Sequence, residues 1–110
     1  MTKFYGLLGL CARAGKIVSG EKNVETLVKQ GGAEMVLVDG GISETGMKSV
    51  TDACRYVGIT WFVTGPGELG PAIGKPGRMT AAVTEKGFAQ RLAVLARDTQ
   101  SDAGVHEGNG

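Results

Sequence analysis

The sequence predicts an α/β protein: a three-layer α/β/α sandwich in which a mixed sheet of about four strands carries helices on both faces. Two observations support this fold class. Apolar residues at helical spacing alternate along the chain with short apolar runs that lack a helical period. Apolar residues also make up 42% of the 110 residues, as in proteins with a packed core. We expect one domain over residues 1–98 and a disordered tail over 99–110, where apolar residues are few.

The first third of the chain is predicted to form a helix, a strand and a second helix. Residues 3–14 form the first helix, whose inward face carries four apolar side chains: Phe4, Leu7, Leu8 and Cys11. Gly15 ends this helix, and a short strand follows at residues 17–18. The second helix covers residues 20–30 and buries Val24, Leu27 and Val28.

The middle of the chain continues the alternation. Residues 35–38 form an uninterrupted apolar strand, which is typical of a strand buried on both faces. Ser43 begins a helix that ends at Gly58 and turns three side chains inward: Met47, Val50 and Cys54. A further strand is predicted over residues 59–63.

The last third begins with a stretch rich in glycine and proline, residues 65–70, and a short helical segment that ends at Gly74. A turn over residues 75–78 leads into a strand at residues 79–83. The final helix turns Phe88, Leu92 and Leu95 inward. All four predicted strands are expected to be buried between helices.

Charge and hydropathy restrict the partners. The formal net charge of +1 is too small for tight binding to duplex nucleic acid of any sequence by counterion release. DNA is therefore not an expected partner. Any nucleic acid that binds must be recognised locally and by its shape. No apolar run approaches the ~18 residues of a membrane span, so we expect a cytoplasmic protein without a membrane partner. Cys11 and Cys54 are expected to be buried free thiols, not a disulfide or a zinc site.

The sequence predicts no catalytic residues, no metal site and no cofactor. The single histidine, His106, lies far in sequence from either cysteine. Residues 65–70 match G-x-G-x-x-G, but glycine and proline interrupt the helix that a dinucleotide site requires. Residues 70–75 are one residue short of a phosphate-binding loop. Asp39 follows a buried strand, where α/β enzymes place active groups, but such an aspartate more often hydrogen-bonds its own turn. We therefore predict a protein that is not an enzyme.

The strongest functional signal is in residues 16–31. Lys16 opens a short strand, a Ser-Gly corner follows, and the first turn of the next helix presents three polar side chains: Glu21, Lys22 and Asn23. Unpaired N–H groups at a helix N-terminus suit phosphate, while Lys and Asn are side chains that read guanine and adenine edges. Such a corner can read folded RNA. The alternative is an ordinary helix start that Ser19 caps, with Lys22 and Asn23 merely solvated.

The order of elements and three segments together resemble a known family. The segments are SGEKNVETLVKQGGAEMVLVDGGIS, ACRYVGITWFVTGPGELGPAIGK and RMTAAVTEKGFAQRLAVL. They resemble the ribosomal protein L7Ae/L30e superfamily, and most closely its small bacterial members of the YlxQ type. The likeness covers residues 3–97, and its strongest marks are Gly20, the segment from Leu69 to Gly74, and AAVTEKGFA.

The resemblance implies an RNA-binding protein that recognises kink-turn or related bulged RNA in the ribosome or another ribonucleoprotein of translation. In the family the start of the second helix meets purine edges that regular A-form RNA hides. Carried over by position, that contact comprises Gly20, Glu21, Lys22, Asn23 and Thr26. Thr26 stands where the family has a lysine. We expect the protein to be a monomer.

The second implied contact is the loop before the last predicted strand, which in the family covers an extruded base. Here the loop comprises Gly74, Lys75, Pro76, Gly77, Arg78 and Met79. Pro76 and Met79 are expected to pack on a base, and Lys75 and Arg78 to hold phosphate. Two alternatives remain open: the loop is a plain connecting turn, or the chain is a protein-interaction module of the translation apparatus that keeps the fold without tight kink-turn binding.

Overall fold

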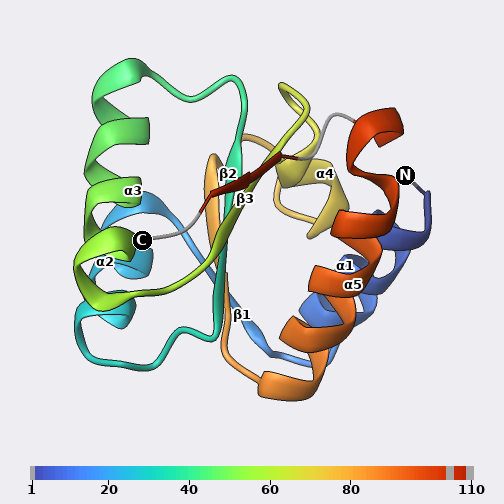
Figure 1. The fold of residues 1–110 in the computed structure, drawn as a ribbon, viewed down its shortest axis with the longest axis horizontal. Helices are drawn as coiled ribbons and strands as arrows, with labels where there is room; N and C mark the ends of the chain where they lie inside the picture. Colours follow the sequence, from blue (N-terminus) through green and yellow to red (C-terminus); the bar gives the residue numbers. More distant parts are fainter. Residues whose placement is uncertain (1, 104–105, 109–110) are drawn as a thin grey trace.

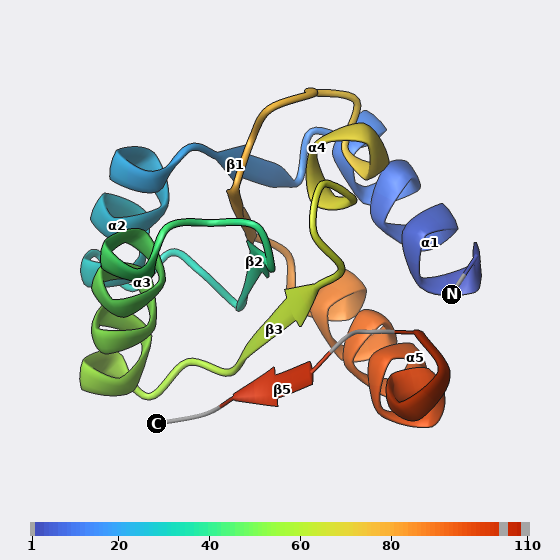
Figure 2. The same ribbon diagram turned by 90° about the horizontal axis from the view of Figure 1, so that it is seen from above.

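The computed structural model describes residues 2–103 and 106–108, and it has the predicted three layers (Figure 1). A mixed sheet forms the middle layer. Helices α1, α4 and α5 cover one face of the sheet, and α2 and α3 cover the other (Figures 1 and 2). The predicted α/β/α sandwich is therefore confirmed.

The elements follow one another in nearly the predicted order. The helices are α1 (Thr2–Arg13), α2 (Glu21–Lys29), α3 (Glu44–Val57), α4 (Leu69–Ala72) and α5 (Lys86–Ala103). The strands are β1 (Ile17–Ser19), β2 (Met35–Asp39), β3 (Trp61–Thr64), β4 (Thr80–Val83) and β5 (His106–Gly108).

The strands lie in the order β1-β4-β2-β3-β5. Strands β2 and β3 are parallel, with Val38 opposite Val63, and the other neighbouring pairs are antiparallel. Consequently β1, β2 and β3 end at the same edge of the sheet, at which β4 begins. Four connections meet at this edge: β1 to α2, β2 to α3, β3 to α4, and α4 to β4.

Two apolar clusters hold the layers together. Under α1, α4 and α5 the largest fully buried side chains are Phe4, Leu8, Leu37, Phe62, Leu69 and Leu92. Under α2 and α3 they include Val24, Val28, Val36 and Val50. Every residue of β2 is buried, so the prediction of a strand enclosed on both faces is confirmed. Strand β1 differs from the prediction: its three residues are only half-buried, because it lies at the edge of the sheet.

Both cysteines are free thiols within this interior, as predicted. Cys11 lies in the cluster under α1, and Cys54 lies in the cluster under α3. Burial in apolar surroundings disfavours the thiolate and raises the pKa of each cysteine to about 11. Neither thiol is therefore an activated nucleophile.

The C-terminal part differs from the sequence prediction. Residues 99–110 are predicted to be disordered, whereas α5 continues to Ala103 and β5 pairs with the outer edge of β3 (Figure 2). This pairing uses the free backbone groups of an edge strand, so it does not need the apolar side chains that the segment lacks. The sheet has five strands instead of about four. Residues 104–105 and 109–110 lie outside the described part. No helix of the described residues is long and apolar enough to cross a membrane.

Candidate nucleic-acid interface

Helix α2 begins at Gly20 without a side-chain cap. Gly20 is the N-cap residue, with φ 102° and ψ 139°, and no side chain accepts a hydrogen bond from the first turn. Its N–H group donates to the carbonyl of Thr80 at 3.1 Å, and its carbonyl accepts from Val24 at 2.9 Å. The interpretation with Ser19 as the capping residue is therefore wrong. The N–H groups at the start of α2 are left open to an anionic ligand.

The loop between α4 and β4 lies directly beside this helix start (Figure 2). A Cβ atom built on Gly20 would lie 2.8 Å from Nη1 of Arg78. The positive φ of 102° favours glycine at position 20, and the Arg78 guanidinium occupies the space next to it. The two segments that the sequence analysis singles out, 58 residues apart at Gly20 and Arg78, form one continuous surface. We call it the α2–loop surface and define it as residues 20, 22, 23 and 74–79.

Lys22 and Asn23 are both exposed on this surface. Lys22 takes part in neither of the two ion pairs found among the described residues. Asn23 uses one amide N–H to donate to the carbonyl of Ser19 at 3.2 Å, which fixes the side chain beside Gly20. Its Oδ1 atom accepts no hydrogen bond in the described structure. An ammonium group and an oriented amide therefore remain available at the helix start.

Two of the predicted residues differ in placement from Lys22 and Asn23. The carboxylate of Glu21 turns toward the first turn of α3, where Oε1 lies 2.5 Å from a Cβ built on Gly46. Lys16 lies at the opposite end of β1, where its carbonyl accepts the backbone N–H of Thr84 at 2.9 Å. The structure therefore does not bring Lys16 to the α2–loop surface. Thr26 is exposed one turn after Lys22, on the same side of α2.

The loop over residues 74–79 is held in one conformation by backbone hydrogen bonds. The N–H of Lys75 donates to the carbonyl of Gly70 at 2.9 Å, and the N–H of Asp39 donates to the carbonyl of Met79 at 2.8 Å. Gly70 is buried in α4, and a Cβ there would meet the Lys75 carbonyl oxygen at 2.8 Å and the Gly77 nitrogen at 2.9 Å. The short helix α4 is therefore the support on which the loop rests.

The side chains of this supported loop face solvent. Lys75, Pro76 and Arg78 are exposed, and Met79 is half-buried. Gly74 and Gly77 have φ values of 73° and 90°, as expected for turns that need positive φ. Cations at positions 75 and 78 thus flank an exposed proline ring, next to the open start of α2.

Asp39 joins the neighbouring connections beneath the surface. Its side chain is 1% exposed, and its carboxylate accepts three backbone N–H groups: from Gly41 at 2.8 Å, from Gly67 at 2.8 Å and from Leu69 at 3.1 Å. The interpretation of Asp39 as a turn residue is confirmed.

Gly67 and Leu69 belong to the G-x-G-x-x-G match, and the N–H groups that would bind a phosphate there are already bonded to Asp39. Helix α4 has only four residues, so the dinucleotide interpretation fails on both counts.

A second contact fixes the connection after β3. The hydroxyl of Tyr5 on α1 donates to Oε1 of Glu68 at 2.5 Å. Partial burial and the neighbouring Glu68 carboxylate raise the pKa of Tyr5 above its usual value, so the phenol stays a neutral donor. The connection between β3 and α4 is therefore held by α1 as well as by Asp39.

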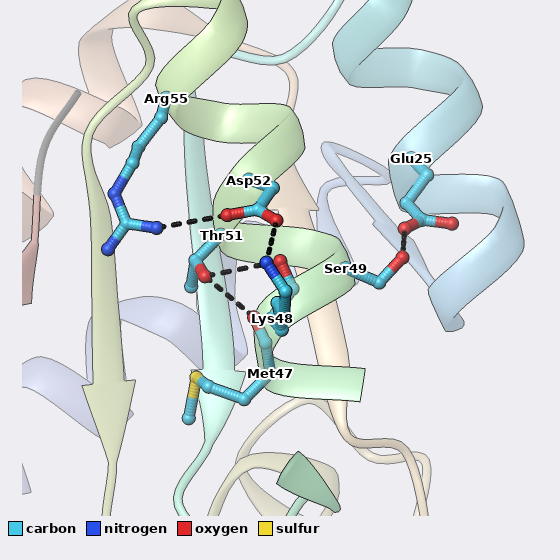
Figure 3. A network of polar contacts seen from close by, with 7 residues as sticks. All are labelled: Glu25, Met47, Lys48, Ser49, Thr51, Asp52 and Arg55. Atoms are coloured by element: carbon cyan, nitrogen blue, oxygen red, sulfur yellow. Dashed lines mark hydrogen bonds and ion pairs between the residues drawn. The ribbon is translucent and has the colours of Figure 1, made fainter. Parts of the chain in front are cut away.

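Polar side chains on α3 contact one another, and one of them contacts α2 (Figure 3). Asp52 accepts from Lys48 at 2.9 Å and from Arg55 at 3.1 Å. The hydrogen bond from Lys48 is the main reason that the pKa of Asp52 lies below its usual value. Ser49 on α3 donates to Glu25 on α2. Lys48 and Arg55 are thus engaged with Asp52, and the Ser49–Glu25 contact links α3 to α2.

Comparisons with known proteins agree with this architecture. Residues 2–102 match the model of the Ribosomal protein L7Ae/L30e/S12e/Gadd45 family. The RNA-binding protein YlxQ of Bacillus subtilis is 39% identical over 94 residues, which are 84% of this chain and 94% of that protein. The RNA-binding protein YlxQ of Enterococcus faecium is 32% identical over 94 residues, which are 84% of this chain and 90% of that protein.

Solved structures show the same fold. A Bacillus halodurans protein of unknown function matches with a TM-score of 0.84 and 34% identity, over 88% of this chain and 99% of that one. The Giardia lamblia 15.5kD RNA binding protein matches with a TM-score of 0.68 and 19% identity, over 88% of this chain and 84% of that one. The family model covers nearly the whole chain and two relatives exceed 30% identity, so the resemblance predicted from the sequence is confirmed: this protein is a member of the Ribosomal protein L7Ae/L30e/S12e/Gadd45 family.

Proposed function

We propose that this protein binds structured RNA through the α2–loop surface. The observation that carries the proposal is the position of the Arg78 guanidinium next to Gly20, because the uncapped helix start and the cationic loop then adjoin. The names of the two YlxQ relatives, which are at least 32% identical to this chain, support RNA as the ligand.

The preferred RNA within this proposal is a kink-turn or a related bulged helix. A-form duplex hides its base edges in a deep, narrow groove, whereas a bulge displays them. In this proposal Lys22 and Asn23 hydrogen-bond exposed purine edges, with guanine suited to Lys and adenine suited to Asn. Lys75 and Arg78 hold the phosphates on either side of an extruded base, and Pro76 offers that base an apolar surface.

The small number of cations also favours recognition by shape. Lys22, Lys75 and Arg78 are the three cations of the α2–loop surface, and the net charge of the whole chain is +1. Even if all three contacted phosphate, they would give too little counterion release for tight binding to unspecific RNA. Affinity must therefore come from hydrogen bonds of the side chains to base edges and of the backbone N–H groups to the RNA. We propose that this RNA belongs to the ribosome or to another ribonucleoprotein of translation.

A direct test is a titration of labelled kink-turn RNA followed by fluorescence anisotropy. The proposal predicts saturable binding at micromolar protein or below, in low salt with magnesium. The matched control RNA has its tandem sheared G·A pairs replaced by Watson–Crick pairs, and its binding should be much weaker. Absence of binding to the kink-turn RNA at micromolar protein, or equal binding of both RNAs, would contradict the kink-turn proposal.

A protein-interaction role is the second candidate, favoured by Thr26. The family has a lysine at this position, and threonine removes that cation from the side of α2 that carries Lys22. If this candidate holds, a partner from the translation apparatus will still be recovered with the protein after nuclease treatment. Loss of the partner after nuclease treatment would favour RNA binding.

A further inference from the structure

Helices α1 and α5 lie side by side on the face of the sheet opposite α2 and α3 (Figure 1). An apolar groove runs between them. It has a volume of about 660 Å³, and its apolar lining comes from Leu7, Leu10, Val94 and Leu95. Leu10 and Val94 are 51% and 57% exposed, which is unusual for large apolar side chains so close together. The helices of the protein itself leave this strip uncovered.

The charges around the groove have one sign. Lys3 on α1 and Arg91 on α5 line it, are exposed, and take part in neither ion pair of the described residues. The groove lining contains no carboxylate; its remaining members are Gln90 and Gly6. An apolar strip with a cationic border is complementary to an apolar segment that carries acidic residues at its sides.

Other occupants fit less well. The described C-terminal strand, β5, pairs with β3 at the sheet edge and is therefore committed elsewhere. A second copy of the chain docking through the same groove would place Lys3 and Arg91 against the same cations of its partner. A lipid bilayer is flat on this scale, whereas the surface is hollowed between two helices.

We propose that the α1–α5 groove binds an amphipathic helical segment of a partner protein, with an apolar stripe that enters the groove and acidic residues that face Lys3 and Arg91. From Lys3 to Leu10 the groove follows α1 for about two helical turns, so the segment needs two to three turns of apolar side chains at i, i+3, i+4 and i+7. The groove and the α2–loop surface use different residues, so RNA and the partner segment can be bound together.

Gly6 permits a clean test of this proposal. It lines the groove, and a Cβ atom built on it meets no atom within 4 Å. Gly6→Trp therefore adds a large side chain to the groove without displacing the core. Gly6→Ala is the matched control, because it also replaces glycine by a better helix former while leaving the groove open.

The probe is a labelled synthetic peptide of ~18 residues with leucine at helical spacing and glutamate at the flanking positions. Its counterpart replaces every glutamate with lysine. We expect saturable binding of the acidic peptide to the full chain, a loss of at least about tenfold in affinity for Gly6→Trp, and a change below about twofold for Gly6→Ala. In the ¹⁵N-labelled protein, the amide resonances that shift should belong to residues around Leu7, Leu10, Arg91 and Val94.

The remaining outcomes overturn the proposal. No saturation below 1 mM acidic peptide, equal binding of the lysine counterpart, or resonance shifts outside the groove would each exclude a docking site for an acidic helix. Self-association of the unmodified chain that Gly6→Trp abolishes would assign the groove to a second copy. A loss of RNA affinity in Gly6→Trp, with peptide binding unchanged, would assign the groove to RNA. A different outcome, in which neither the unmodified chain nor Gly6→Trp binds RNA, would contradict the proposed RNA-binding function. It would leave the groove proposal standing, because the peptide titration contains no RNA.

Discussion

Helices α2 and α3 lie on the same face of the sheet and follow strands that end at the same edge, but their first turns are built differently. In α3, Ser43 closes the helix start, with its Oγ atom accepting from the N–H of Gly46 at 3.1 Å. In α2, Gly20 leaves the corresponding groups without a side-chain acceptor, and a cationic loop lies beside it. The capped start contributes to stability, and we assign the uncapped start to ligand binding.

The largest effect is expected from removing the glycine at the uncapped start. Gly20→Ala places a Cβ atom 2.8 Å from the Arg78 guanidinium and holds alanine at φ 102°. A residue other than glycine with φ 102° and ψ 139° is strained by about 1–3 kcal/mol, so the chemical denaturation midpoint should fall. Displacement of Arg78 should also weaken kink-turn RNA binding by at least about tenfold, measured by anisotropy at a temperature where the variant is folded.

Gly58→Ala is the control for the strain of Gly20→Ala. Gly58 ends α3 with φ 88°, and a Cβ atom there meets nothing within 4 Å. It should therefore lose about 1–2 kcal/mol of stability through its αL backbone without losing RNA affinity. If both variants bind RNA as the unmodified chain does, the Gly20–Arg78 contact is not part of the binding site.

The second prediction concerns the ammonium group beside the uncapped start. Lys22→Ala should weaken RNA binding by about 1–3 kcal/mol if Lys22 reads a base edge, and its denaturation curve should not change, because the side chain is exposed and unpaired in the described structure. Lys29→Ala, in the last turn of the same helix, removes an equal charge from its other end. Equal losses in the two variants would indicate a general charge effect and remove Lys22 from base recognition.

The third prediction concerns the capped helix. Ser43→Ala removes the acceptor for the Gly46 N–H and should lower the free energy of unfolding by about 1 kcal/mol. RNA affinity should stay within about twofold of that of the unmodified chain, because Ser43 is not part of the α2–loop surface. A large loss of RNA affinity with unchanged stability would reverse the roles assigned to the two helix starts.

The smallest predicted effect is on the salt dependence of RNA binding, which reports how many cations contact phosphate. With Lys75 and Arg78 as the phosphate-facing cations, log Kd against log salt concentration should have a slope of roughly 1 to 2. Arg78→Ala should reduce that slope by about one. An anisotropy titration at several salt concentrations checks both values, and a slope several units steeper would require cations outside the α2–loop surface.

The order of helices and strands was predictable because it depends on local spacing. The apolar run at residues 35–38, the Ser43 cap and the glycine at position 58 each indicate their element within a few residues of sequence. Strand β5 was not predictable, because edge pairing with β3 depends on backbone groups and not on an apolar pattern.

The candidate site was predictable only in part, because its geometry depends on contacts between distant residues. Asp39 accepts hydrogen bonds from residues 28 and 30 positions away, and no local pattern indicates these bonds. The resemblance to the family, and not the spacing of residues, predicted that the 74–79 loop takes part with the start of α2. Lys16 was grouped with that helix start by sequence distance, but the extended strand β1 separates the two by about 3.3 Å per residue.

The most direct test of the α2–loop surface is a titration of the ¹⁵N-labelled protein with kink-turn RNA, followed through the amide resonances. We predict that the resonances of residues 20–23 and 74–79 shift together and saturate at the same RNA concentration, while those around Ser43 at the start of α3 stay in place. Shifts confined to only one of the two segments, or centred on the start of α3, would contradict a single binding surface built from the uncapped helix and its neighbouring loop.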